Sequence, residues 1–271
     1  MSLLASQPGL LQALAGEMTP KFLASRSADG IPNVVPCTSI TAAGDVEDRL
    51  ILGNFLLRKS VRNLDSDPRV SVLVITTELE GWILQGDFEG WQRTGPYVDR
   101  LNSSDLLRYN AYTGIRNAGI IQVRRVLRAF RLPKTRVLAD YLLARAFRPP
   151  ALPADAVEMP LAVRRSFQPM TAIRVLAFID GDSYPLTVPA LSLQPAGERA
   201  MRCAVRECAD LLEPLPAGAA VAASLLTLDV ISFQVKGTWL GSRRLAGALT
   251  AGMAVTSVYA GGPPIPGQRV A

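Results

Sequence analysis

The chain contains no histidine among its 271 residues. This absence excludes a Ser-His-Asp triad, a Cys-His catalytic pair, and a zinc or haem iron held by histidine. Cysteine is scarce too: Cys37, Cys203 and Cys208 are odd in number and widely scattered. That pattern argues against a disulfide framework and a metal site, and it favours a reducing compartment. Any redox chemistry must therefore come from a cofactor held by other groups.

The sequence also lacks a long uninterrupted apolar segment. Its longest uncharged run, residues 245–268, is broken repeatedly by glycine and proline, so we expect neither a membrane-spanning helix nor a membrane as partner. No lysine or arginine precedes Lys21, so the basic region of a secretory signal is missing and we expect a cytoplasmic protein. Hydrophobic residues make up 49% and charged residues 19%, as in globular proteins.

Acidic residues are few in one stretch of this basic chain, whose net charge is +6. Between Arg116 and Arg148 only Asp140 opposes a series of cations: Arg116, Arg124, Arg125, Arg128, Arg131, Lys134, Arg136, Arg145 and Arg148. This surface leaves a nucleic-acid-binding protein open as an alternative. We favour a solvated helix face and a strand edge guarded by charge, because no RNA-binding aromatic signature or zinc-finger spacing accompanies the run.

Short apolar segments bounded by turn residues dominate the remaining sequence. They predict strands at residues 22–25, 32–40, 49–54, 70–76 and 81–89, with a helix at 59–65 between the third and fourth. This order predicts a small barrel, and hence a mainly β fold with helices (α+β). Further helices are expected at 9–15, 98–111 and 135–148, and prolines cluster in a linker at 149–169.

The strand pattern repeats after the linker. Matching residues are Phe22, Asp29 and Pro32 with Val175, Asp182 and Pro185, at an offset of 153, and Val70 and Gly86 with Val221 and Gly237, at 151. Unrelated small barrels could share such turn residues, but we favour two related barrels in tandem. The expected domains are 1–148, a barrel with a helical extension, the linker 149–169, and 170–271, a second, degenerate split barrel.

Residues 58–64 are the strongest indication of a binding site. They place three cations, a hydroxyl and an amide side by side just before an apolar strand, a combination that suits a phosphate monoester. The matching positions of the second half, 209–214, carry Asp210 and Glu213 and no cation. Because these acids would repel a phosphate, we expect one such site per chain, on the first barrel.

These segments together resemble the pyridoxamine 5'-phosphate oxidase-like family, the FMN-binding split barrels. The resemblance covers residues 22–90 well and 175–241 weakly. It rests on the order of Phe22-Leu23-Ala24, Asp29-Gly30, Pro32 to Pro36, Lys59 to Leu64, Pro68 to Ser71, and Gly86. It implies a split barrel, an FMN cofactor, and a site where two barrels meet, within the chain or across a homodimer.

The resemblance also implies which residues hold the cofactor. The implied set is Asn33, Val34, Val35 and Pro36 along the flavin ring, Thr38 toward its phosphate, Gly53 and Asn54 at a strand end, and Lys59 and Ser60 at the paired phosphate positions. Many relatives have Arg and Lys at that pair, so Arg58 or Arg62 would restore the charge that Ser60 lacks. Arg62 and Asn63 have a second interpretation, as a helix surface and a cap.

The chain departs from true pyridoxamine 5'-phosphate oxidases, whose glutamine in the fifth strand is Gly81 here and whose C-terminal histidine is missing. The resemblance therefore implies a related FMN-dependent oxidoreductase with a small-molecule substrate, an electron donor and no assigned catalytic residue. Arg116 and Asn117 are weak candidates for substrate contact. The alternatives are a deazaflavin cofactor, a haem held by Tyr, Cys or Met, and a non-catalytic protein that binds a flavin or another planar ligand.

Overall fold

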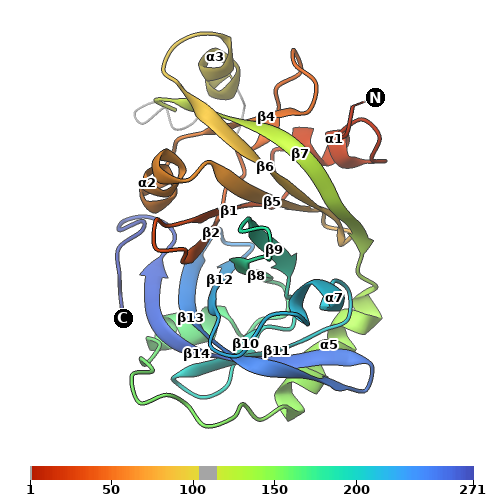
Figure 1. Ribbon diagram of the computed structural model, residues 1–271, viewed down its shortest axis with the longest axis vertical. Coiled ribbons are helices and arrows are strands. Elements are labelled where there is room, and N and C mark those ends of the chain that lie inside the picture. Colours follow the sequence, from red (N-terminus) through yellow and green to blue (C-terminus); the bar gives the residue numbers. More distant parts are fainter. Residues whose placement is uncertain (1, 104–114) are drawn as a thin grey trace.

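The computed structural model describes residues 2–103 and 115–271. The chain forms two seven-stranded antiparallel sheets that lie one above the other (Figure 1). Strands of the first sheet are β1 (Lys21–Arg26), β2 (Pro32–Pro36), β3 (Thr41–Ala42), β4 (Arg49–Gly53), β5 (Arg69–Ile75), β6 (Glu80–Gln92) and β7 (Ala118–Arg131), and its helices are α1 (Leu10–Ala15), α2 (Arg58–Ser66) and α3 (Pro96–Asn102). Its strand order is β2-β1-β5-β6-β7-β4-β3.

The second sheet repeats this topology strand for strand. Its elements are β8 (Ile173–Ile179), β9 (Pro185–Pro189), β10 (Gln194–Pro195), β11 (Ala200–Val205), α7 (Ala209–Leu212), β12 (Ala220–Leu226), β13 (Ser232–Leu245) and β14 (Ala248–Ala260). Its strand order, read from the other end, is β9-β8-β12-β13-β14-β11-β10. The mainly β fold with two related split barrels in tandem is confirmed.

The repeat extends to the pairing register of single residues. Leu23 pairs with Val35 in the first sheet and Leu176 with Val188 in the second, so both partners shift by the predicted 153 positions. Val70 pairs with Gly86 and Val221 with Gly237, each shifted by the predicted 151. Because a one-residue slip would turn every side chain to the opposite face, this agreement identifies the halves as copies of one architecture.

A buried cation occupies the same place in both copies. Lys21 donates from Nζ to the carbonyl oxygen of Thr38 at 3.1 Å. Arg174, which is 153 positions later, donates to the carbonyl oxygen of Leu191, also 153 positions later. Each cation holds the loop that leaves the second strand of its barrel, which is the loop beside the site described below.

The two barrels share a single apolar core. One cluster of buried residues joins Phe22 and Leu73 of the first sheet to Val175 and Trp239 of the second. Side-chain amides also cross the contact: Gln234 Nε2 donates to the Val34 carbonyl at 2.6 Å, and Gln85 Nε2 donates to the Pro185 carbonyl at 3.1 Å. The two copies thus pack against each other within one chain.

Several element boundaries differ from the sequence prediction. The sequence predicts a charge-guarded strand edge within residues 116–148 but no bounds for it, and the structure shows this strand as β7, Ala118–Arg131. The strand expected at 32–40 ends at Pro36, since Cys37–Ile40 closes a turn in which the Ile40 N–H donates to the Cys37 carbonyl. The helix expected at 98–111 is observed as α3, and residues 104–114 of that prediction lie outside the described residues.

The connection between the barrels is more ordered than a simple linker. Helix α5 (Lys134–Ala146) follows the first sheet but packs on β11 and β14 of the second. The proline-rich segment 149–169 contains α6 (Leu161–Ser166), and its Phe167 is fully buried in the shared core. No helix among the described residues is long and apolar enough to cross a membrane.

Candidate functional site

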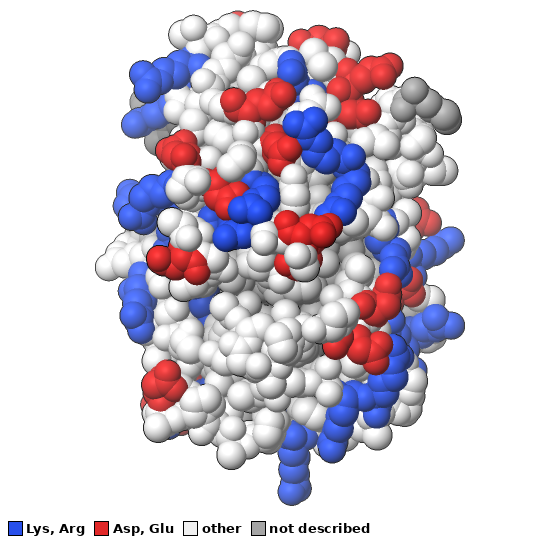
Figure 2. All heavy atoms as spheres, viewed as in Figure 1, with Lys and Arg blue, Asp and Glu red and all other residues white. Residues whose placement is uncertain are grey.

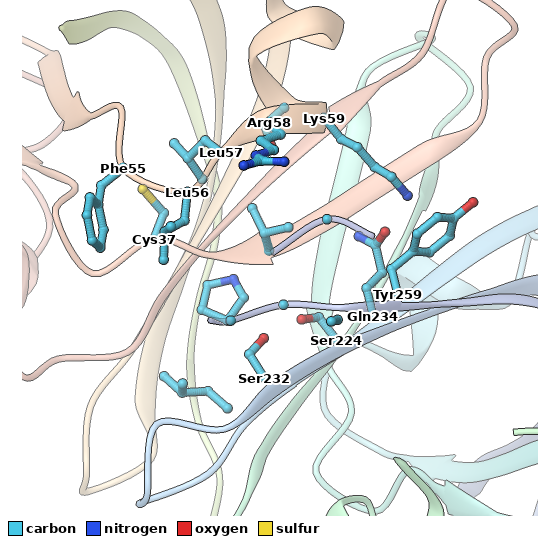
Figure 3. Close-up of a pocket in the computed structure, with 18 of the residues that line it drawn as sticks. Cys37, Phe55, Leu56, Leu57, Arg58, Lys59, Ser224, Ser232, Gln234 and Tyr259 are labelled. Carbon is cyan, nitrogen blue, oxygen red and sulfur yellow. The ribbon is translucent and has the colours of Figure 1, made fainter. Parts of the chain in front are cut away.

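A cavity of about 210 Å³ lies where the two barrels meet. The first half contributes the end of β2 with its following turn and the segment that leads into α2 (Figure 3). The second half contributes the β12–β13 hairpin and the end of β14 with the segment after it. The residues that line the cavity include Asn33, Cys37, Leu56, Lys59, Ser60, Ser224, Val230, Ser232, Gln234 and Tyr259.

The first turn of α2 places Lys59 at one end of this cavity. Its Nζ lies 2.6 Å from the centroid of the Tyr259 ring, which belongs to β14 (Figure 3). Burial, together with the charges of Lys236, Arg62 and Arg269, lowers the pKa of Lys59 to about 7. Among the described residues, no carboxylate forms an ion pair with Lys59. The site therefore gathers positive charge that an anion would neutralise.

Lys236 comes from the second barrel and is close enough to Lys59 for its charge to lower the pKa of Lys59, although it is not one of the residues that line the cavity. It lies on β13 two positions after Gln234, so both side chains are on the same face of the strand. Burial lowers the pKa of Lys236 to about 8. Sequence reasoning missed this residue, because the match at offset 151 is the neutral Gln85 and only the packing of the two barrels brings Lys236 to Lys59.

Three buried polar atoms in the cavity wall have no hydrogen-bond partner among the described residues. They are Asn33 Oδ1, Ser224 Oγ and Ser232 Oγ. Asn33 is fixed in orientation, since its Nδ2 donates to Ser60 Oγ at 3.2 Å and its Oδ1 is left as an acceptor. An unsatisfied buried polar group costs about 1–3 kcal/mol. Their grouping around one cavity indicates a wall built to receive a polar ligand.

The equivalent place in the other half is closed by an ion pair. Ile83 pairs with Arg128 and Gln234 with Tyr259, so Arg128 is the counterpart of Tyr259, and Asp210 is the counterpart of Lys59. Arg128 and Asp210 form a salt bridge with each other. Lys59 thus offers unpaired positive charge to its crevice, whereas in the equivalent crevice Arg128 of the first barrel is neutralised by Asp210 of the second, and an anion would meet a carboxylate there.

The structure brings about half of the predicted cofactor residues to this cavity. The residues that line it are Asn33, Val35, Pro36, Thr38, Arg58, Lys59 and Ser60. Val34 does not, because its side chain is fully buried in the shared core. Gly53 does not line the cavity either, but its N–H donates at 3.0 Å to the Oγ of Ser39, which does.

The remaining predicted residues lie elsewhere. Arg62 is exposed on α2, and its positive charge contributes to the lowered pKa of Lys59. Asn63 Nδ2 donates to Ser25 Oγ at 3.1 Å and ties α2 to β1. The Asn54 N–H donates to the Asn117 carbonyl at 2.9 Å, and Arg116 is exposed. None of these residues lines the cavity.

The arginine-rich stretch is largely paired where it forms β7. Ion pairs join Arg124 to Asp87, Arg125 to Asp182, Arg128 to Asp210 and Arg131 to Glu80. In Figure 2 the basic and acidic side chains are interleaved over the face shown. These pairs support the interpretation of a strand guarded by charge rather than a free anionic-ligand surface.

No family model matches the sequence, and no curated protein matches it. Solved structures, in contrast, are similar over about half of the chain. An FMN-binding protein from Syntrophomonas wolfei subsp. wolfei is 16% identical, with a TM-score of 0.39 over 49% of this chain and 88% of that one. A protein assigned as a pyridoxamine 5'-phosphate oxidase, from Lactobacillus delbrueckii, is 14% identical, with a TM-score of 0.37 over 47% of this chain and 100% of that one.

HutZ, the heme storage protein from Vibrio cholerae, is likewise 14% identical, with a TM-score of 0.35 over 48% of this chain and 95% of that one. These likenesses concern the fold alone. Each covers about half of this chain and most or all of the other protein. The comparison thus finds FMN-binding and pyridoxamine 5'-phosphate oxidase-like split-barrel proteins, the family that the sequence resembles.

Proposed function

We propose that the cavity between the barrels binds FMN and that the chain is an FMN-dependent oxidoreductase. The observation that carries the proposal is Lys59, which lines the cavity with its Nζ 2.6 Å from the centroid of the Tyr259 ring, has no described carboxylate partner, and has the partly desolvated Lys236 nearby. A phosphate monoester supplies the missing negative charge and accepts charge-assisted hydrogen bonds from both ammonium groups. Inorganic phosphate alone would satisfy the charge, so the ring must be supported separately.

The rest of the wall fits a flavin ring. Asn33 Oδ1 is an acceptor fixed by the bond from Asn33 Nδ2 to Ser60, and a flavin carries one ring N–H that could donate to it. The unpartnered hydroxyls of Ser224 and Ser232 can donate to ring carbonyl oxygens. The cavity volume of about 210 Å³ is below the ~300–1,000 Å³ typical of ligand pockets, so part of the ligand must extend to the cavity mouth.

The cofactor would supply the electron transfer, and the residues of this chain would bind and orient it. Lys59 and Lys236 hold the phosphate, Asn33 positions the ring, and the apolar wall around Leu57 excludes water. The Cys37 thiol is not a nucleophile here, because burial raises its pKa to about 11. No side chain of the cavity is required as a general base, in keeping with the absence of histidine.

The structure explains one departure from the oxidases of the family. A Cβ atom at Gly81 would lie 2.4 Å from the ring of Phe130 and 2.6 Å from the Val74 carbonyl. A glutamine cannot be accommodated at this position, so the side chain that those oxidases place near the flavin is missing. This observation favours a second candidate function, a protein that binds the flavin without turnover.

Absorption spectroscopy and turnover assays separate these possibilities. Purified protein titrated with FMN should show a shifted flavin spectrum, saturate at one FMN per chain and gain thermal stability. Inorganic phosphate at the same concentration should stabilise it less. Oxidation of NADH or NADPH by the FMN-loaded protein supports the oxidoreductase, and tight FMN binding without turnover supports the binding protein. No change in spectrum or in stability contradicts both.

A further inference from the structure

Large apolar side chains are exposed at the mouth of the cavity. Leu56 and Val230, which line it from opposite barrels, are 38% and 69% exposed. The β12–β13 turn that carries Val230 also presents Leu228, at 81% the most exposed large hydrophobic residue described, and Ile231 at 44%. We refer to Leu56, Leu228, Val230 and Ile231 as the apolar rim.

Two members of this rim have an unfavourable backbone conformation. Leu56 has a φ of 63° and Val230 a φ of 59°, in the left-handed region that a β-branched residue rarely adopts. Hydrogen bonds hold the Val230 turn in place: the Val230 N–H donates to the Thr227 carbonyl and the Ile231 N–H to Thr227 Oγ1, both at 3.0 Å. Backbone strain of this kind gathers at ligand-binding positions.

The first barrel contains the same turn without the apolar tip. The Glu80 N–H donates to Thr76 Oγ1 at 3.2 Å, and Leu79 has a φ of 64°. Its exposed tip has Thr77 and Glu78 where the second barrel has Leu228 and Asp229, and its Leu79, the counterpart of the exposed Val230, packs against the shared core. The turn therefore does not require apolar residues at its tip. The second barrel presents them only where the cavity opens.

We propose that the apolar rim binds the second substrate of the flavin site, and that this substrate is an uncharged, apolar ring compound. The inference rests on the proposed function, because it assigns the inner cavity to FMN. Exposed apolar side chains on either side of a cavity mouth offer two surfaces between which a flat apolar molecule is removed from water. An uncharged molecule suits this surface best, because Asp229 in the same exposed turn would repel an anion, and Arg58 and Lys59 of the cavity lining would repel a cation.

Equilibrium dialysis of 2-naphthol, which is uncharged at pH 7, against FMN-saturated protein tests the proposal. The variants Leu228→Ser and Ile231→Ser, at two rim residues that do not line the cavity assigned to FMN, should each weaken 2-naphthol binding at least fivefold and leave FMN affinity unchanged. Leu142→Ser is the matched control, because Leu142 is 56% exposed on α5, away from the cavity. It should leave both affinities unchanged.

Three outcomes would overturn the inference. They are absence of 2-naphthol binding, equal weakening by the rim and control variants, and a loss of FMN affinity in the rim variants as large as the loss for 2-naphthol. The last result would mean that the rim holds the flavin itself. If FMN does not bind at all, the proposed function fails. Binding of 2-naphthol to the unliganded protein can still be measured, and comparison of the rim variants with Leu142→Ser then shows whether that binding depends on the rim.

Discussion

Replacement of Lys59 by alanine is the sharpest test of the anion site. Lys59 has no described carboxylate partner, so its removal leaves no buried acid uncompensated, and the loss reports on the ligand alone. A charge-assisted hydrogen bond contributes about 1.5–3 kcal/mol, which corresponds to a roughly 10- to 150-fold rise in the Kd for FMN. Lys59→Arg should keep most of the affinity, because the charge remains.

Lys134→Ala is the control for this experiment, since Lys134 is exposed at the start of α5 and carries the same charge. Its effect on the Kd should be under about twofold at 0.15 M salt, where exposed distant charges are screened. The assay is FMN fluorescence quenching or spectral titration. Unchanged FMN affinity in Lys59→Ala, or an equal loss in Lys134→Ala, would refute the assignment of Lys59 to the phosphate.

The pH dependence adds an independent check. In the free protein the pKa of Lys59 is lowered to about 7 by burial, and a bound phosphate dianion must raise it. Binding is then coupled to uptake of a proton above pH 7, so FMN affinity should fall as pH rises from 7 to 8. Lys59→Arg stays charged over this range and should lose most of this slope. An identical slope in wild type and Lys59→Arg would contradict the argument.

Three further predictions concern the rest of the chain. Val230→Gly should raise the free energy of unfolding in urea by about 1 kcal/mol, because it relieves a strained φ at an exposed residue. Leu79→Gly should lower the free energy of unfolding, because packing against the core is lost; equal effects of the two substitutions would contradict this reasoning. Asp210→Ala should leave the stoichiometry at one FMN per chain; a value of two would contradict the expectation of a single FMN site per chain. Duplex DNA should not bind at 0.15 M salt, because ion pairs neutralise the β7 arginines; salt-sensitive binding would restore the nucleic-acid hypothesis.

Local patterns in the sequence were sufficient to predict much of the fold. Turn residues such as Asp29 and Pro32 recur at fixed offsets, and their positions specify where strands begin and how they pair. The bounds and ion pairs of strand β7 escaped prediction because its arginines have partners far away in sequence. Asp182 and Asp210 lie in the other barrel, and no local pattern reveals an ion pair across 57 or 82 residues.

The candidate site was predictable only in part, for a related reason. Lys59, Ser60 and Asn33 belong to one barrel, and their spacing is visible along the chain. Lys236 and Tyr259 complete the site from the other barrel, and their approach depends on how two sheets pack. Sheet packing follows from the shapes of whole apolar faces, so residues that meet across the contact carry no mutual signal in the sequence.

The presence of two copies in one chain has a consequence for how such a site can change. In a symmetric dimer every substitution occurs twice, so a residue that improves one interfacial site alters the other identically. Covalent linkage of the copies removes that constraint. Lys59 and Asp210 occupy equivalent positions yet carry opposite charges, and the neutral Tyr259 is the counterpart of the cationic Arg128. One crevice could thus specialise for a ligand while the other became a permanent fastening between the two halves.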